Sequence, residues 1–117
     1  MKTVEISIIA PVFNEEAIVE EFYNRVVNVL NKVSASFEII FIDDGSTDKT
    51  LYKIKKLVEE DAVVKALSFS RNFGHNMAIS AGLVYAQSEA AIIIDGDLQD
   101  PPEVLPEFIN KWKEGYD

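Results

Sequence analysis

One stretch, Ile92-Ile93-Ile94-Asp95-Gly96-Asp97-Leu98-Gln99-Asp100-Pro101-Pro102-Glu103, sets both the fold and the site expected of this chain. Its three isoleucines are typical of a strand buried in a sheet. Asp95 and Asp97 follow directly and can point to one side of an extended or tightly turning backbone, with Gln99 continuing the row. Oxygen donors in such a row suit Mg²⁺ or Mn²⁺, which also take waters and substrate phosphates. The stretch therefore predicts a site for a metal ion and a diphosphate.

A structural interpretation of the same stretch is a turn followed by a helix start. Asp100 would be the N-cap, Pro101 would occupy the first helical position, and Glu103 would complete a capping box. Capping accounts for Asp100 and Glu103. It does not account for Asp95 and Asp97, whose like charges repel at the tip of an apolar strand.

Composition places the chain among globular domains. Its 117 residues, 48% of them apolar, suffice for one domain with a real core. No apolar run approaches the length of a membrane span. The absence of cysteine excludes disulfides and thiolate metal sites and is compatible with a cytoplasmic location. A formal charge of −9 argues against nucleic acid as a partner, but a nucleotide could bind through a bridging divalent ion.

Strand-like and helical segments alternate along the chain. Helical apolar stripes separate and follow four strand-like runs, which are residues 5–10, 37–42, 63–68 and 90–94. The second and fourth runs are almost continuously apolar, which predicts strands covered on both faces. The alternation predicts an α/β fold with a parallel, doubly wound sheet and helices on both faces. We expect the strand order 3-2-1-4, which brings Pro11–Glu15 next to Asp95–Asp97 at the switch point.

Polar side chains follow every predicted strand, where ligands bind in such sheets. The four segments are 11–16, 43–48, 70–75 and 95–97. Helix capping by Asn14 and Ser46 explains part of this pattern. It does not explain the adjacent carboxylates Asp43 and Asp44, of which we expect at least one to contact a ligand.

Two further polar residues are ambiguous. Arg71 is either a phosphate contact or a solvated side chain, and His75, the only histidine, is interpreted as a cap or surface residue.

Taken together, these segments resemble the family-2 glycosyltransferases, which have the Rossmann-like GT-A fold. The resemblance covers essentially the whole chain and is carried by three motifs, at residues 11–15, 42–48 and 95–103. The extension Asp97–Glu103, together with Arg71–Gly74, resembles the polyprenyl-phosphate sugar transferases, a group that includes dolichol-phosphate mannose synthase and bacterial undecaprenyl-phosphate glucosyltransferases.

The resemblance implies a nucleoside pocket at the ends of the first two strands. Pro11, Phe13 and Glu15 would line it, and Ile42 and Asp44 would hold the base and ribose. Phe13 stands where tyrosine is frequent in the family, so a contact made by that hydroxyl would be missing.

The resemblance also assigns the metal site. Asp95, Asp97 and Gln99 would bind Mg²⁺ or Mn²⁺ and, through it, the donor diphosphate. Gly96, where alanine is frequent in the family, would allow close approach of the backbone.

The implied activity is inverting transfer of a sugar from a UDP- or GDP-sugar to a polyprenyl phosphate, in cell-envelope glycan or glycolipid synthesis. Residues 1–117 would form the single N-terminal nucleotide-sugar-binding domain of a longer enzyme, truncated before the acceptor half and inactive alone. That enzyme would work in the cytoplasm at the inner face of the membrane. The exposed edge of the fourth strand predicts self-association.

Three alternatives remain open at this point. The first is a family-2 transferase with a saccharide acceptor. The second is a phosphatase of the haloacid-dehalogenase type, although that resemblance requires Thr or Val where Gln99 stands and places the motif after the first strand. The third is a non-catalytic nucleotide-binding or receiver-like module. The acidic pair of a receiver would follow the first strand, whereas Asp43 and Asp44 follow the second.

Overall fold

The computed structural model describes residues 4–115. The strands are β1 (Val4–Val12), β2 (Phe37–Asp43), β3 (Val64–Ser68) and β4 (Ser88–Ile93). The helices are α1 (Val19–Leu30), α2 (Thr50–Glu60), α3 (His75–Tyr85) and α4 (Leu105–Lys113), with a 3-10 turn η1 (Pro102–Val104) before α4. The predicted alternation of strands and helices is therefore confirmed. No helix among the described residues is long and apolar enough to cross a membrane.

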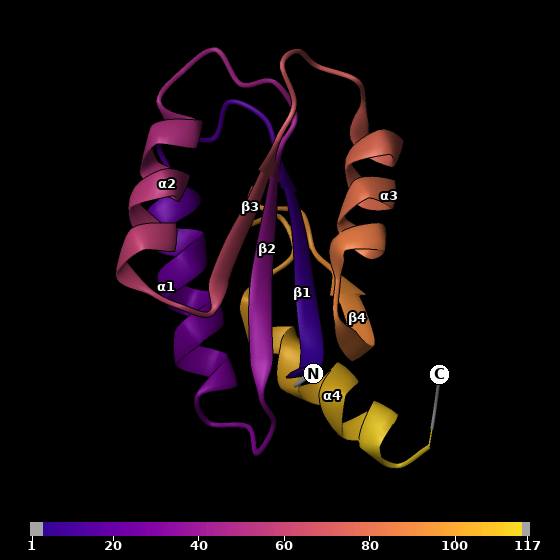
Figure 1. Ribbon diagram of the computed structural model, residues 1–117. Coiled ribbons are helices and arrows are strands. Elements are labelled where there is room, and N and C mark those ends of the chain that lie inside the picture. The colour runs from indigo at the N-terminus through magenta and orange to yellow at the C-terminus, as the bar shows by residue number, and fades with distance from the viewer. Residues whose placement is uncertain (1–3, 116–117) are drawn as a thin grey trace.

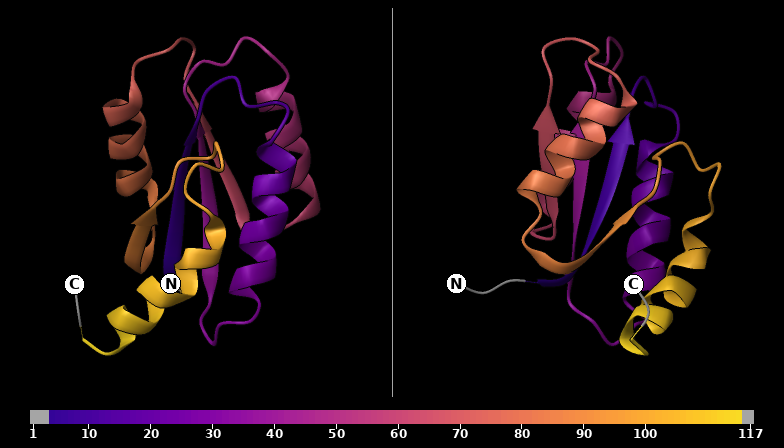
Figure 2. Two further views of the ribbon diagram at one scale, coloured as in Figure 1. Left: turned by 180° about the vertical axis from the view of Figure 1, so that it is seen from behind. Right: turned by 90° about the vertical axis from the view of Figure 1, so that its right-hand side faces the viewer.

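All sheet pairings are parallel, and the strand order is β3-β2-β1-β4, as predicted. Helices cover both faces of this sheet, with α1, α2 and α4 on one face and α3 alone on the other (Figures 1 and 2). From β1 the chain first builds the sheet in one direction, through β2 and β3, and then returns to add β4 on the other side of β1. The strand order therefore reverses between β1 and β4. A crevice beyond the carboxyl ends of β1 and β4 is therefore expected.

The core lies on both faces of β1 and β2. Ile8, Phe22 and Phe41 belong to the larger cluster beneath α1, α2 and α4, whereas Ile9 and Ile40 belong to a smaller cluster beneath α3. The smaller cluster requires α3 to approach the sheet closely. A Cβ at Gly82 would lie 2.6 Å from Cγ2 of Ile9, so glycine is needed there.

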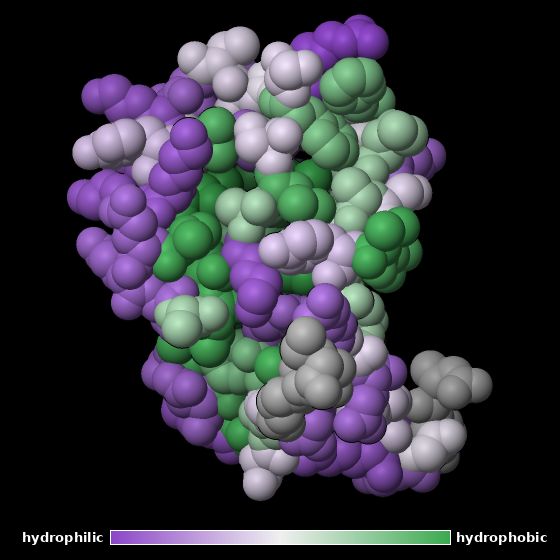
Figure 3. Space-filling view, in the orientation of Figure 1, coloured by the Kyte–Doolittle hydropathy of each residue, from purple (hydrophilic) through white to green (hydrophobic). Residues whose placement is uncertain are grey.

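The prediction that β4 is covered on both faces is wrong. Its residues alternate between half-buried and exposed, and Ile93 keeps 44% of its surface exposed. The physical reason is position, because β4 forms an edge of the sheet and α3 packs over β1 and β2. In the view of Figure 3, hydrophilic side chains gather over α2, whereas apolar side chains also reach the surface of the sheet and of α3.

The predicted capping box after β4 is also wrong. Pro101 precedes the 3-10 turn with no side-chain cap, and α4 begins at Leu105 rather than beside Asp100. Glu103 instead accepts hydrogen bonds from Arg25, with its Oε1 2.6 Å from the Nη2 of that arginine. The side chain predicted to cap its own helix thus links η1 to α1.

Asn14 and Ser46 do not cap helices either. The residues at the N-cap positions of α1 and α2 are Ile18 and Lys49, neither of which makes a side-chain cap. Asp48 serves α2 instead, because its Oδ1 accepts the backbone N–H of Thr50 at 2.9 Å.

Candidate functional site

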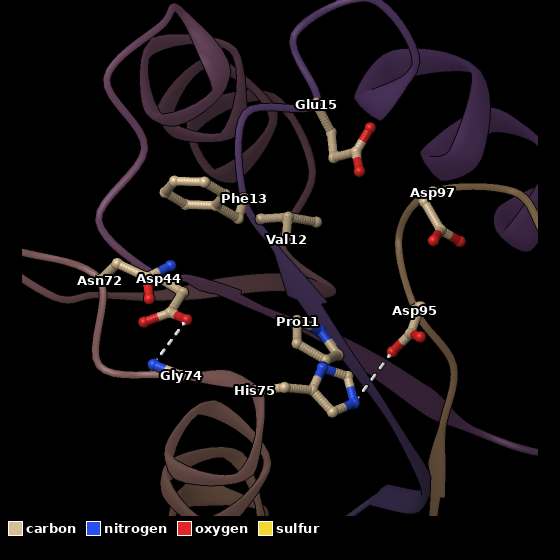
Figure 4. A pocket seen from close by; sticks show the side chains of 10 residues that line it. All are labelled: Pro11, Val12, Phe13, Glu15, Asp44, Asn72, Gly74, His75, Asp95 and Asp97. Carbon is tan, nitrogen blue, oxygen red and sulfur yellow. Dashed lines mark hydrogen bonds and ion pairs between the residues drawn. The ribbon is translucent and has the colours of Figure 1, made fainter.

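A cavity of about 250 Å³ opens beyond the carboxyl ends of the strands, at the predicted switch point (Figure 4). The ends of β1 and β2, the loop between β3 and α3, and the loop after β4 all contribute to it. Its lining residues are Pro11, Val12, Phe13, Glu15, Asp44, Asn72, Gly74, His75, Asp95 and Asp97. Five of these, Pro11, Phe13, Glu15, Asp44 and Asp95, were expected in the site, as was Asp97 as a metal ligand.

One side of this cavity, which we call the tied wall, consists of residues 13–16 and 44–50. Side chains of each segment bind the backbone of the other. The N–H of Asn14 donates to Oγ of Ser46 at 2.9 Å, and Oδ1 of Asn14 accepts the N–H of Thr47 at 2.8 Å. The N–H of Glu15 donates to Oγ1 of Thr50 at 2.8 Å. These bonds therefore hold the backbone of the segment that carries Phe13 and Glu15.

Asp44 anchors the loop between β3 and α3 to this wall. Its two carboxylate oxygens accept the N–H groups of Phe73 at 2.8 Å and Gly74 at 3.0 Å. Gly45 beside it has φ +77°, and a Cβ there would lie 2.2 Å from the carbonyl carbon of Arg71. Asp44 lines the cavity and also determines where the next loop lies.

Asp43, its neighbour, does not line the cavity. It is 1% exposed, one of its oxygens has no hydrogen-bond partner in the described structure, and burial raises the pKa of its carboxyl group. Arg71 is likewise turned elsewhere, with its guanidinium carbon 4.3 Å from the centre of the Phe73 ring.

The opposite side, which we call the β4 loop, consists of residues 94–99. Two backbone bonds attach it to β1, from the N–H of Ile94 to the carbonyl of Ile9 at 3.0 Å and from the N–H of Gly96 to that of Pro11 at 3.2 Å. A Cβ at position 96 would lie 2.4 Å from Cγ1 of Val12. Glycine at 96 thus allows the loop to approach β1 closely, and Asp95 and Asp97 border the cavity. A close approach of the Gly96 backbone to a ligand stays a prediction.

Three predicted site residues, Ile42, Gly96 and Gln99, do not line the cavity. Ile42 is fully buried in the cluster beneath α3. Gln99 is exposed and does not line the cavity, and its N–H donates to Oδ1 of Asp97 at 3.0 Å. Leu98 has φ +64°, so the chain turns between Asp97 and Gln99 and the predicted row of three donors is broken.

Sequence reasoning missed His75 and Asn72. Nε2 of His75 lies 3.4 Å from Oδ1 of Asp95, and Figure 4 shows the imidazole directed from α3 toward that carboxylate. The only available signal was a lone histidine after a glycine at a helix start, which by itself fits a surface residue equally well.

The charges in the cavity are strongly unbalanced. Glu15, Asp44, Asp95 and Asp97 bring four carboxylates to it, and His75 is the only side chain there that can carry a positive charge. Burial, followed by the negative charges of Asp97 and Asp48, raises the pKa of Glu15. A cation between Asp97 and Glu15 would relieve this repulsion.

The donors suit a hard divalent cation that shares its ligands with a substrate. No group of three or more histidine and acidic side chains within residues 4–115 forms a complete metal cage. Mg²⁺ commonly binds to one or two carboxylates together with waters and substrate phosphates. Asp95 and Asp97 fit that mode of binding.

Comparison with known proteins agrees with this arrangement. The family model "Glycosyl transferase family 2" matches residues 7–117. The chain belongs to this family. Asp95 and Asp97 follow β4, whereas the haloacid-dehalogenase alternative requires such a pair after the first strand.

Two curated relatives illustrate the similarity of this family-2 chain. It is 46% identical over 114 residues to the uncharacterized glycosyltransferase YkcC of Bacillus subtilis, which covers 97% of this chain and 35% of that protein. It is 48% identical over 113 residues to the prophage bactoprenol glucosyl transferase homolog of Escherichia coli, covering 97% and 37% respectively. The chain therefore spans about a third of the length of these relatives.

Among solved structures, the fold of this glycosyltransferase chain resembles that of the mannosyltransferase PcManGT from Pyrobaculum calidifontis, solved in complex with GDP-Man and Mn²⁺. The TM-score is 0.75 at 21% identity, over 93% of this chain and 32% of the other. The likeness shows that the sheet described above is the GT-A fold.

Proposed function

We propose that this chain is the donor-binding domain of a longer enzyme that transfers a sugar from a nucleoside-diphosphate sugar to a polyprenyl phosphate. The observation that carries the proposal is the cavity in which Asp95 and Asp97 face the tied wall at the switch point of a GT-A sheet. The bactoprenol glucosyl transferase name of a 48% identical relative supports the acceptor class.

The nucleoside would bind along the tied wall. Phe13 is 42% exposed beside the cavity, and its ring offers an apolar face to a base. The carboxylates of Glu15 and Asp44 can accept hydrogen bonds from ribose hydroxyls or a base N–H, as acidic residues do in other nucleotide sites. These groups suit either UDP or GDP. Ile42, buried beneath, would support the pocket without touching the nucleotide.

Asp95 and Asp97 would hold Mg²⁺ or Mn²⁺ on the other side. When bound, such a cation neutralises the diphosphate and stabilises it as a leaving group. Gln99 would serve as a third ligand only after reaching the cavity, which it does not line here. The two carboxylates cannot bind a diphosphate by themselves because like charges repel, so donor binding should depend on the cation.

The reaction would be a single displacement with inversion. An oxygen of the acceptor phosphate forms a bond to the anomeric carbon, while the bond from that carbon to the donor diphosphate breaks and its electron pair leaves with the nucleoside diphosphate. A phosphate monoester is already ionised near neutral pH, so it needs positioning more than a general base. The enzyme would meet this lipid at the cytoplasmic face of the membrane, in cell-envelope glycan or glycolipid synthesis.

The free edge of β4 supports a weaker proposal, self-association of the isolated chain. The strand has no partner on its outer side among the described residues, and Ile93 is exposed on it. Unpaired edge strands readily accept another strand. Sedimentation at increasing concentration should show dimers, and a monomer throughout would refute this proposal.

Transfer of radiolabelled sugar by the full-length protein tests the main proposal. UDP-glucose, UDP-N-acetylglucosamine and GDP-mannose are each offered with a short-chain polyprenyl phosphate or with free saccharides, in Mg²⁺, Mn²⁺ or a chelator. We expect one donor to label the lipid phosphate only when the cation is present. Labelling of saccharides alone would refute the lipid acceptor, and transfer in the chelator would refute the role of the cation.

A further inference from the structure

We propose that His75 is a positioning residue that holds Asp95 in the orientation needed for cation binding. This inference rests on the proposed function and extends it to a side chain that no motif assigns. It starts from the contact between Nε2 of His75 and Oδ1 of Asp95 at 3.4 Å, which joins the first residue of α3 to the β4 loop.

The contact matters because Asp95 has little else to hold it. Its side chain is 42% exposed, and the contact with His75 is the only polar side-chain contact to its carboxylate among the described residues. Asp97, by contrast, accepts the N–H of Gln99. A carboxylate that ligates a metal is normally fixed by a second hydrogen bond, and such outer partners affect metal affinity strongly. An Nε2–H donated to Oδ1 would leave Oδ2 of Asp95 directed to the cation.

The position of His75 is itself determined by the tied wall. Asp44 binds the N–H groups of Phe73 and Gly74, which immediately precede the histidine. Further along the same helix, the packing of Gly82 against Ile9 holds α3 over β1. The order of support therefore runs from Asp44 through the β3–α3 loop to His75, and from there to Asp95 on the opposite side of the cavity.

Histidine suits this role better than the other lining residues. His75 and Asn72 are the only side chains of the cavity that can donate a hydrogen bond, and the described structure shows only His75 in contact with an acidic group. The imidazole remains 54% exposed, so it is not held there by burial in the core.

Two measurements on the 117-residue chain test the inference. Because His75 is the only histidine, its ring signals in nuclear magnetic resonance spectra need no assignment by mutation. At one fixed pH and without metal, we expect its Nε2 and Hε1 resonances to shift in Asp95→Ala. They should not shift in Asp100→Ala, which removes a carboxylate that directly follows the β4 loop and does not line the cavity. Resonances that ignore Asp95→Ala would overturn the contact.

The second measurement is Mn²⁺ affinity, followed by electron paramagnetic resonance in the presence of UDP or GDP. His75→Ala should weaken it about tenfold, and His75→Gln, which keeps a donor, should recover most of the loss. The adjacent exposed Asn76→Ala is the matched control, and all variants should unfold at the wild-type temperature. Equal affinity of His75→Ala and the wild type would overturn the inference alone. A wild-type chain that binds no Mn²⁺ would instead overturn the proposed function.

Discussion

The two sides of the cavity are built in different ways. The tied wall is held by reciprocal hydrogen bonds between residues 14–16 and 46–50, which lie more than thirty positions apart in the sequence. The β4 loop has two backbone bonds to β1 and one contact with His75. Segments held by few bonds open at low free-energy cost. The tied wall is therefore the more firmly held side, and the loop with Asp95 and Asp97 is the less firmly held one.

The largest effect should follow from breaking the tied wall at Gly45. Gly45→Ala places a Cβ against the Arg71 backbone in a left-handed conformation, and we expect a loss of about 3 kcal/mol in the free energy of unfolding in urea. Gly115→Ala is the matched control, because its φ is +103° with nothing within 4 Å, and it should lose only about 1 kcal/mol. Equal losses would mean that the contact with the β3–α3 loop contributes nothing.

On the other side, Asp97→Asn should impair binding and spare the fold. We expect Mn²⁺ affinity in the presence of nucleotide to fall at least about tenfold, since a ligand should matter no less than its outer partners. The unfolding free energy should stay within about 0.5 kcal/mol, because Oδ1 of asparagine can still accept the N–H of Gln99. Asp100→Asn, directly after this loop, should change neither quantity. A loss of stability comparable to that of Gly45→Ala would contradict the contrast between the two sides.

The sequence predicted more of the fold than of the site. Alternating apolar runs predicted a parallel sheet, and the need to bring residues 11–15 next to 95–97 at a switch point predicted the order β3-β2-β1-β4. The same runs could not show that one face of β4 stays open, since apolar content does not say which helix covers an edge. Spacing two apart predicted Gln99 in the row with Asp95 and Asp97, but the positive φ of Leu98 turns the backbone. His75 could not be found locally, because its partner comes from a different strand.

A smaller and pH-dependent effect should appear at Asp48 in the tied wall. Burial alone would raise the pKa of this carboxyl group, but hydrogen bonds from Thr50 and the N–H of Glu16 outweigh it and lower the pKa. The charged form is therefore favoured in the folded state. Its stabilisation is complete above about pH 5 and is lost as the pH falls below the ordinary aspartate pKa of about 3.9 and through the lower folded value.

Urea unfolding of Asp48→Ala checks this assignment. At pH 7 we expect it to be less stable than the wild type by about 1 kcal/mol. The pH-dependent part of the difference should shrink as the pH is lowered toward the folded pKa. A difference that is constant with pH would show that the charge of Asp48 is not involved.

The smallest effect should come from Glu103, which lies outside both the tied wall and the β4 loop. It pairs with Arg25 on the surface between η1 and α1, and exposed ion pairs contribute little. Glu103→Gln should unfold at the wild-type temperature in a thermal melt, at low and at high salt. A clear loss, present only at low salt, would give this surface pair a role in docking η1 that its exposure does not predict.

Isothermal titration of the chain with UDP and with GDP tests the central claim, that a divalent cation joins the diphosphate to Asp95 and Asp97 while the tied wall receives the nucleoside. The titrations are run in Mn²⁺, in Mg²⁺ and in a chelator. We predict that one nucleotide binds when the cation is present and that the heat disappears in the chelator, because four carboxylates would otherwise face the phosphates. Equal binding of a nucleotide with and without the cation would contradict the account.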